Sequence, residues 1–333
     1  MELLEKLLAG IHLSQQEAEA AMEGMVGGSF TPAQSAALLV ALKMKGETAE
    51  EILAFARVMR KRAVKITPHA QGLLDTCGTG GDGSHTFNVS TAAALIAAGA
   101  GAAVAKHGNR SVSSKCGSAD VIEALGMKIL QPQEAEKCIG ETGFGFLFAP
   151  YFHPAMKNVA QVRRELGVRT IFNVLGPLSN PAGAQSQLIG VFSEEAARKM
   201  ADALCMLGTT HAIVASAGGL DEISLGKSAI FEVKGGRVER LGIDAADFGF
   251  AQGEIPKVQS AQESAGFIMG ILEGKQGAAR DVAVLNAGTA LYAAGKAGSI
   301  ACGVGLAKGA IDSGKAREKF EHVKLFCEKA GGG

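Results

Sequence analysis

Hydrophobic and polar positions follow two different patterns along this chain, and the change falls near residue 66. Over the first part, apolar side chains recur at helical spacing, for example within 38–42 and 52–59. Capping boxes, in which a Ser or Thr pairs with a Glu or Gln three positions later, start at Ser14, Thr31 and Thr48. This pattern predicts a small helical domain over residues 1–66.

Beyond residue 66, short apolar runs alternate with Ala-rich helical stretches, which is typical of an α/β fold with crossover helices and a central, mostly parallel sheet. Helices are predicted over 92–98 and 194–207. Strands are predicted over 73–75, 102–106, 145–148, 188–191, 212–215 and 230–233. Residues 154–181 return to a helical pattern, so we expect them to join the small domain. The large α/β domain then comprises 67–153 and 182–333.

Composition and charge narrow the classes of function. The 333 residues carry 33 basic and 33 acidic side chains, whereas a nucleic-acid-binding protein usually has a basic excess. The six cysteines form no C-x-x-C pair, as is typical of reduced thiols in the cytoplasm. The first residues do not resemble a signal peptide, and no apolar run reaches the length of a membrane span. We therefore expect a cytoplasmic protein with no nucleic-acid partner and no membrane partner.

A glycine-rich segment, DTCGTGGDGSHTFNVST (75–91), follows the first predicted strand. A dinucleotide-binding G-x-G-x-x-G would need a helix that opens at the glycines and an acidic residue about 20 positions later. Here the loop continues past the glycines, and no Asp or Glu occurs between Asp82 and Asp120. Glycine amides and a helix start with Ser90 and Thr91 instead predict a phosphate or pyrophosphate site. A tight turn with an N-cap is the alternative.

A second polar segment, KHGNRSVSSKCGS (106–118), also follows a predicted strand, where ligands of α/β sheets gather. Its cations and hydroxyl groups suit phosphate oxygens, and a solvated basic loop is the alternative. The cations and hydroxyls are Lys106, Arg110, Lys115, Ser111, Ser113, Ser114 and Ser118.

Two further segments carry candidate chemistry. In GLDEIS (219–224), the neighbouring carboxylates of Asp221 and Glu222 suit Mg²⁺ shared with substrate phosphates, and a polar turn is the alternative. In the helical stretch after His153, Arg163 can hold a carboxylate through two hydrogen bonds. An ordinary surface position is the default for such an arginine, and the residues alone favour it.

Taken together, four segments resemble anthranilate phosphoribosyltransferases, and the resemblance covers nearly the whole chain. In order they are GTGGDGSHTFNVST, KHGNRSVSSKCGSADVIEALG, HPAMKNVAQVRRELGVRTIFNVLGPLSNP and GLDEIS. The resemblance implies a small helical domain beside a large α/β domain, as in nucleoside phosphorylases, and a homodimer formed through the helical domain. It implies Mg²⁺-dependent transfer of the phosphoribosyl group of phosphoribosyl pyrophosphate to the amine of anthranilate, in tryptophan biosynthesis.

The resemblance also implies roles for individual residues. Phosphoribosyl pyrophosphate is expected to contact Gly78, Gly81, Asp82, Thr86, Asn88, Ser90, Thr91, Lys106, His107, Gly108, Asn109, Arg110, Ser111, Ser113, Ser114 and Ser118. Anthranilate is expected to contact Gly78, His107, Asn109, His153, Arg163 and Pro177. The expected metal ligands are Ser90, Asp221 and Glu222. Lys106 is expected to stabilise the leaving pyrophosphate, and Asn109 and Arg163 to position the nucleophile, so these three are the expected catalytic residues.

One departure from the family pattern is visible. Family members commonly carry His-Gly shortly before Gly-Leu-Asp-Glu, whereas this chain has Ala-Ser-Ala-Gly-Gly over 215–219. Both carboxylates are nevertheless intact. The alternatives are a pyrimidine nucleoside phosphorylase, which shares the architecture, and a nucleic-acid-binding paralogue on the same fold.

Overall fold

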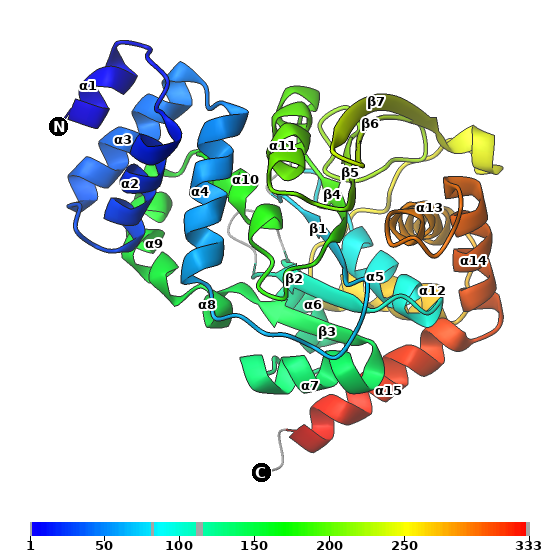
Figure 1. Ribbon diagram of the computed structural model, residues 1–333. Helices are drawn as coiled ribbons and strands as arrows, with labels where there is room; N and C mark the ends of the chain where they lie inside the picture. Colours follow the sequence, from blue (N-terminus) through cyan, green and yellow to red (C-terminus); the bar gives the residue numbers. More distant parts are fainter. Residues whose placement is uncertain (1, 81–82, 111–115, 331–333) are drawn as a thin grey trace.

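The computed structural model describes residues 2–80, 83–110 and 116–330 (Figure 1). The chain begins with the helices α1 (Glu2–Leu8), α2 (Gln15–Val26), α3 (Pro32–Lys45) and α4 (Ala49–Arg62). Each of the last three starts with the predicted capping box, in which the hydroxyl and the acidic or amide side chain satisfy each other's backbone N–H groups. The sequence pattern of this region is therefore confirmed by the local structure.

A seven-stranded sheet forms the centre of the rest of the molecule, in the order β3-β2-β1-β4-β5-β6-β7. The strands β3 to β5 along this order are parallel, and β6 and β7 add antiparallel hairpin strands at one edge. Their bounds are β1 (Leu74–Gly78), β2 (Val104–Gly108), β3 (Phe144–Phe148), β4 (Ser186–Gly190), β5 (His211–Ser216), β6 (Lys227–Lys234) and β7 (Arg237–Asp244). The predicted α/β class and mostly parallel sheet are confirmed, and β7 is an additional strand.

Helices cover both faces of the sheet (Figure 1). On one face α5 (Val89–Gly99) and α13 (Ala278–Ala293) pack against the parallel strands, and on the other α11 (Glu194–Met206) packs against β5 and β6. Alternate residues of a strand point to opposite faces, so Leu188 belongs to the first core and Ile189 to the second. The remaining helices of the α/β part are α6 (Ser118–Ala124), α7 (Pro132–Thr142), α12 (Ala261–Leu272), α14 (Ile300–Asp312) and α15 (Lys315–Ala330).

A returning segment links the sheet to the first helices. After β3 the chain forms α8 (Ala149–Phe152), α9 (Lys157–Leu166) and α10 (Phe172–Leu175). Helix α9 packs on α2 and α3, and α10 packs on α4. The second apolar core runs without interruption from α4 through α10 to α11 and the sheet. This packing therefore fixes the position of the helical part beside the carboxyl ends of the parallel strands. Across the described ranges, no helix has both the length and the apolar character that a bilayer crossing requires.

Candidate active site

The site lies at the carboxyl ends of β1 and β4, where the connections diverge because β2 lies on one side of β1 and β4 on the other. The GLDEIS segment covers this point. A Cβ on Gly190 would lie 1.4 Å from the Asp221 carbonyl oxygen, and one on Gly78 would lie 2.5 Å from Asp221 Oδ2. Glycine alone permits so close an approach. The Gly80 amide donates to Asp221 Oδ2 at 2.7 Å, so the two motifs, distant in sequence, meet here.

The turn before Asp221 is held by its own backbone. The Ala217 amide donates to the Leu220 carbonyl at 3.3 Å, and the Leu220 amide donates back to Ala217 at 3.1 Å. Gly218 and Gly219 have φ angles of 59° and 101°, which favour glycine. The turn therefore keeps its shape without a histidine side chain.

Lys106, on β2, lies beneath the glycine loop and is buried. Its ammonium donates to the Thr76 carbonyl at 2.5 Å and to Ser90 Oγ at 3.0 Å. Burial lowers its pKa, and the negative charges of Asp75 and Glu222 act in the opposite direction. The predicted Lys106 and Ser90 are thus brought together, with the cation below the loop and in electrostatic contact with a predicted metal ligand.

Asp75 balances this buried lysine, and the sequence interpretation missed it. Its Oδ1 accepts from the His107 amide at 3.0 Å and its Oδ2 from Asn180 Nδ2 at 2.8 Å. The same Asn180 nitrogen donates to the Ala105 carbonyl at 2.8 Å. Burial raises the pKa of Asp75 to about 6, although the Asn180 bond and the Lys106 charge act against that rise. An acidic residue inside an otherwise apolar strand was the available signal.

The rings of His107 and His153 pack against each other next to this network, with their planes tilted by 58°. Their ring centroids are 5.1 Å apart, and His107 Nδ1 donates to the Gly176 carbonyl at 3.1 Å. Burial lowers the pKa of His107 to about 3 and that of His153 to about 4. Both imidazoles are therefore neutral near pH 7. Each Nε2 is buried without a hydrogen-bond partner, so each can bind a polar ligand atom.

Arg163 extends from α9 over the Phe172 ring, with its Cζ 5.2 Å from the ring centroid. The side chain is half-buried and burial lowers its pKa, but no carboxylate among the described residues pairs with it. Arg164, its neighbour, is exposed. A partly desolvated guanidinium without an internal partner is suited to binding a carboxylate from outside. Pro177, the last predicted residue of this part, is buried, and its carbonyl accepts from Gln187 at 2.7 Å.

The start of α5 differs slightly from the sequence interpretation, which began the helix near Ser90. The N-cap is Asn88, whose Oδ1 accepts from the Thr91 amide at 3.0 Å. Ser90 Oγ lies 3.4 Å from the same oxygen. Thr86 stands just before this cap and pairs across the loop with Lys257. The helix N-terminus and its hydroxyl groups are therefore grouped as an anion site requires.

The segment after β2 is arranged differently from its predicted role. Ser118 Oγ donates to the Asn109 carbonyl at 3.3 Å, which keeps these two residues beside Gly108. Arg110, in contrast, pairs with Asp120 at 2.7 Å and with Glu123 at 2.6 Å on α6. These pairs raise its pKa, and binding a phosphate would require exchanging them. The other residues predicted to contact phosphoribosyl pyrophosphate lie outside the described residues: Gly81, Asp82, Ser111, Ser113 and Ser114.

Buried polar side-chain atoms without partners concentrate around this site. In the part of the chain that the structure describes they belong to Thr79, His85, Thr91, His107, His153, Gln187 and Arg280. Of the first five, His107 lies on β2, and the other four lie on segments that follow β1 or β3. Native proteins satisfy nearly all buried polar groups, so this concentration indicates that a ligand supplies the missing partners. Thr79 and His85 were not among the predicted residues.

The oxygen atoms available as metal ligands at the site fit Mg²⁺. Within the described ranges, no group of three or more His, Cys, Asp or Glu side chains gathers to form an all-protein metal cage. Mg²⁺ usually binds through one or two carboxylates together with substrate phosphates and water. Asp221 and Glu222, with the Ser90 hydroxyl nearby on α5, offer such a set beside a predicted phosphate site.

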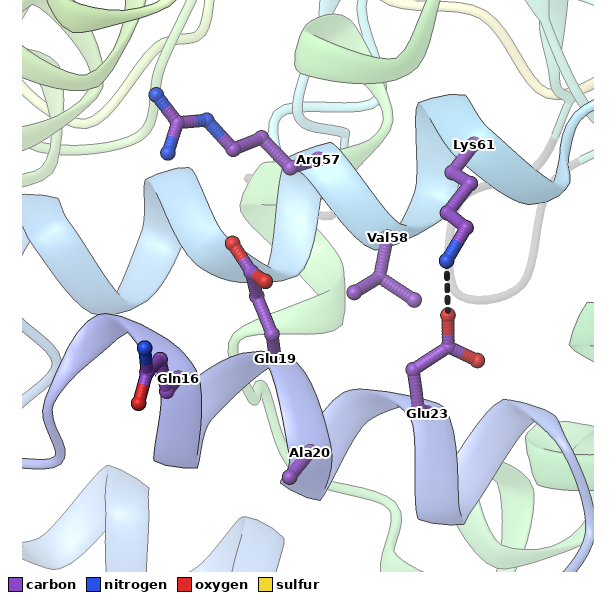
Figure 2. Close-up of a pocket in the computed structure, with 7 residues that line it drawn as sticks. All are labelled: Gln16, Glu19, Ala20, Glu23, Arg57, Val58 and Lys61. Carbon is purple, nitrogen blue, oxygen red and sulfur yellow. Dashed lines mark ion pairs between the residues drawn. The ribbon is translucent and has the colours of Figure 1, made fainter.

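A separate hollow lies between α2 and α4, away from the strand ends (Figure 2). Glu23 on α2 faces Lys61 on α4, at 3.9 Å, and Glu23 also pairs with Arg62. These opposite charges compensate each other, and the hollow contains none of the residues discussed above. We assign it no ligand.

Comparisons with known proteins show the family to which the chain belongs. The α/β domain of the glycosyl transferase family matches residues 70–317, and the helical bundle domain of that family matches residues 1–63. Anthranilate phosphoribosyltransferase from Pelotomaculum thermopropionicum is 51% identical over 328 residues, 97% of this chain and 95% of the relative. The chain belongs to the anthranilate phosphoribosyltransferase family.

Solved structures of this family share the fold. The enzyme from Thermus thermophilus superposes with a TM-score of 0.93 at 43% identity and covers 98% of this chain and 100% of its own. The Saccharomyces cerevisiae enzyme, solved in complex with PRPP and Mg, has a TM-score of 0.89 at 27% identity over 98% of this chain and 97% of its own. The fold predicted from the family resemblance is therefore confirmed.

The two neutral histidines predict a specific pH dependence of stability. Their native pKa values of about 3 and 4 lie below the ordinary value of 6.5. Between these values the unfolded chain therefore binds protons that the native state does not bind. The free energy of unfolding should fall as pH drops from about 6.5 toward 4. Asp75, whose native pKa is raised, contributes an opposite and smaller slope below about pH 6.

Urea unfolding at pH 7 and pH 5 measures this effect. In His153→Gln, the decrease in the free energy of unfolding from pH 7 to pH 5 should be smaller than in the wild type by about 2 kcal/mol, since one of the titrating groups is gone. The exposed His69 is the control, because His69→Gln should leave the slope unchanged. Parallel pH profiles for the wild type and His153→Gln would contradict the assignment of a buried neutral imidazole.

Proposed function

We propose that this protein transfers the 5-phosphoribosyl group of phosphoribosyl pyrophosphate to the amine of anthranilate. The products are N-(5-phosphoribosyl)anthranilate and pyrophosphate, and the reaction belongs to tryptophan biosynthesis. The observation that carries the proposal is the meeting of the glycine loop with Asp221 over the ends of β1 and β4. Anthranilate phosphoribosyltransferases at about half identity over the full length support the choice of substrates.

Phosphoribosyl pyrophosphate, the phosphoribosyl donor, binds at the glycine loop and the start of α5. Backbone amides of the loop and the N-terminus of α5 bind its phosphates, helped by the hydroxyls of Ser90 and Thr91. The same donor reaches Gly78, Thr86, Asn88, Lys106, His107, Gly108, Asn109, Arg110 and Ser118, together with Gly81, Asp82, Ser111, Ser113 and Ser114. Asp221, Glu222 and Ser90 would hold Mg²⁺, which neutralises charge on the leaving pyrophosphate.

The acceptor lies on the side of the helical part. Arg163 binds the anthranilate carboxylate through its guanidinium, which has no carboxylate partner among the described residues. His107 and His153 offer neutral rings with unpartnered Nε2 atoms, and Gly78, Asn109 and Pro177 complete this pocket. Because the imidazoles are neutral, the positive charge here comes from Arg163.

The chemistry needs positioning and electrostatics more than a reactive side chain. The amine nitrogen forms a bond to C1 of the ribose while the bond from C1 to the pyrophosphate oxygen breaks, and the amine then releases one proton to the pyrophosphate or to water. Lys106, buried below the loop, stabilises the negative charge of the leaving group. Arg163 and Asn109 orient the amine, and good orientation alone contributes up to about 7–11 kcal/mol in favourable cases.

The decay of anthranilate fluorescence tests this function directly. Purified protein should consume anthranilate only when phosphoribosyl pyrophosphate and Mg²⁺ are both present. Asp221→Asn combined with Glu222→Gln should lower the rate strongly at limiting Mg²⁺, since carboxylates bind this ion far better than amides do. A flat trace from folded protein that instead cleaves thymidine with free phosphate would refute the proposal in favour of a nucleoside phosphorylase.

Arg163→Ala separates the two substrates. The variant should raise the KM for anthranilate by about tenfold or more, because a charge-assisted pair is lost, and leave the KM for the donor within twofold. Arg164→Ala is the matched control, one position away on the same helix but exposed, and should behave like the wild type. An equal rise of both KM values in Arg163→Ala would remove it from the anthranilate site.

The finer organisation is also proposed here. Residues 1–66 and about 154–181 form the helical domain, supported by the packing of α9 on α2 and α3, while 67–153 and 182–333 form the α/β domain. The protein acts in the cytoplasm as a homodimer. Large apolar side chains exposed on α1, the turn after it and α3 support this interface: Leu8, Ile11, Val40 and Met44.

Light scattering on the full chain tests the dimer. The wild type should have twice the mass of one chain, and Ile11→Glu with Met44→Glu should have the mass of one, because charges would be buried at the interface. Leu306→Glu, at an exposed apolar position on α14, is the control and should stay dimeric. A wild type with the mass of one chain would contradict the proposal.

A further inference from the structure

His85 has an unusual backbone conformation inside the glycine loop. Its φ is +55°, and it is the sole non-glycine residue with a positive φ in the ranges that the structure describes. This left-handed region is unfavourable for residues with a Cβ, and glycine or asparagine adopts it more easily. A histidine in this position therefore costs conformational energy that a glycine would not.

The surrounding backbone explains how this conformation is held. The His85 carbonyl accepts from the Val258 amide at 2.8 Å, and the Phe87 amide donates to the Pro256 carbonyl at 3.1 Å. Phe87 is buried and contacts Phe267 on α12, at a centroid distance of 5.6 Å. Neither bond uses the side chain of residue 85, so both would be equally available with glycine at this position.

The imidazole itself has no structural role that would explain its presence. Its Nδ1 is buried without a hydrogen-bond partner, and the ring makes no aromatic contact or ion pair within the described part of the chain. A strained residue with an unsatisfied buried nitrogen points to a ligand, because strain and unsatisfied groups persist mainly where function requires them. Thr79 and Thr91, at the two ends of the same loop, also carry buried hydroxyls without partners.

We propose that His85 Nδ1 donates a hydrogen bond to a phosphate oxygen of the phosphoribosyl donor. The inference rests on the proposed function, since it places that donor in this loop. It adds a donor-binding residue that the sequence motifs did not single out. The phosphate belongs either to the pyrophosphate or to the 5-phosphate of the ribose, and these share the same chemistry.

His85→Gly is the variant that best separates a ligand-binding role of the ring from a structural one. It removes the imidazole and at the same time relieves the backbone strain, so the melting temperature should stay equal or rise. The Kd of one phosphate probe should rise by about tenfold, as expected for a lost hydrogen bond to a charged group. Steady-state kinetics should show the same rise in the KM for the donor, with the KM for anthranilate within twofold.

Calorimetry on the full chain provides the measurement, with pyrophosphate plus Mg²⁺ as one probe and ribose 5-phosphate as the other. A weaker Kd for pyrophosphate places the bond at the leaving group, and a weaker Kd for ribose 5-phosphate places it at the 5-phosphate. His85→Asn, which keeps an N–H donor on a shorter side chain, should recover part of the affinity. His69→Gly, at an exposed histidine before β1, should leave both Kd values unchanged.

Two results would overturn the inference. The first is a Kd within twofold of the wild type for both probes in His85→Gly. The second is a lower melting temperature in His85→Gly with both KM values raised together, which would mean a structural role for the ring. Binding of the probes does not depend on turnover, so a protein that binds pyrophosphate but does not consume anthranilate refutes the proposed function and still decides the role of His85.

Discussion

The side chain of Asp75 is completely buried, yet separate segments of the chain depend on its two oxygens. One oxygen accepts from the amide of His107 on β2, and the other accepts from Asn180, which comes from the returning segment. The charge of Lys106 lies close enough to favour the ionised carboxylate. Breaking such a network would leave a buried charge uncompensated, which is strongly destabilising. The position of β2, of the lysine and of the returning segment therefore depends on this carboxylate.

The returning segment transmits that position to the helical part. The Pro177 carbonyl accepts from Gln187 on β4 at 2.7 Å, and the Leu178 carbonyl accepts from Arg60 on α4 at 2.6 Å. A few consecutive residues are thus bonded to the sheet on one side and to the helices on the other. Helix α9, which carries Arg163, is part of the same segment. The distance between the proposed sites for anthranilate and for phosphoribosyl pyrophosphate is therefore set by these hydrogen bonds rather than by a flexible linker.

What the sequence could predict was mostly local. Capping boxes and helical periodicity involve neighbours a few positions apart, and each apolar strand can be predicted from its own run of apolar residues. Strand β7 lacked that signal because half of its residues are exposed, half are charged, and only one is buried. The pairing of Asp75 with Asn180 and the left-handed φ of His85 could not be predicted, because each depends on contacts with segments far along the chain. The motifs predicted loops that bind phosphoribosyl pyrophosphate, but they gave no sign of the buried groups that support these loops.

Both substrates in the proposed reaction are anions, and the structure offers a way to bring them together without strong repulsion. In this proposal the phosphates of phosphoribosyl pyrophosphate bind backbone amides and the positive end of α5, which carry partial charges. In this proposal the carboxylate of anthranilate binds Arg163, which comes from α9. Burial keeps His107 and His153, which belong to the same proposed site, neutral. A protonated pair there would draw both anions to the same place. Neutral rings let each anion keep its own partner, so that the amine, rather than the carboxylate, approaches C1 of the ribose.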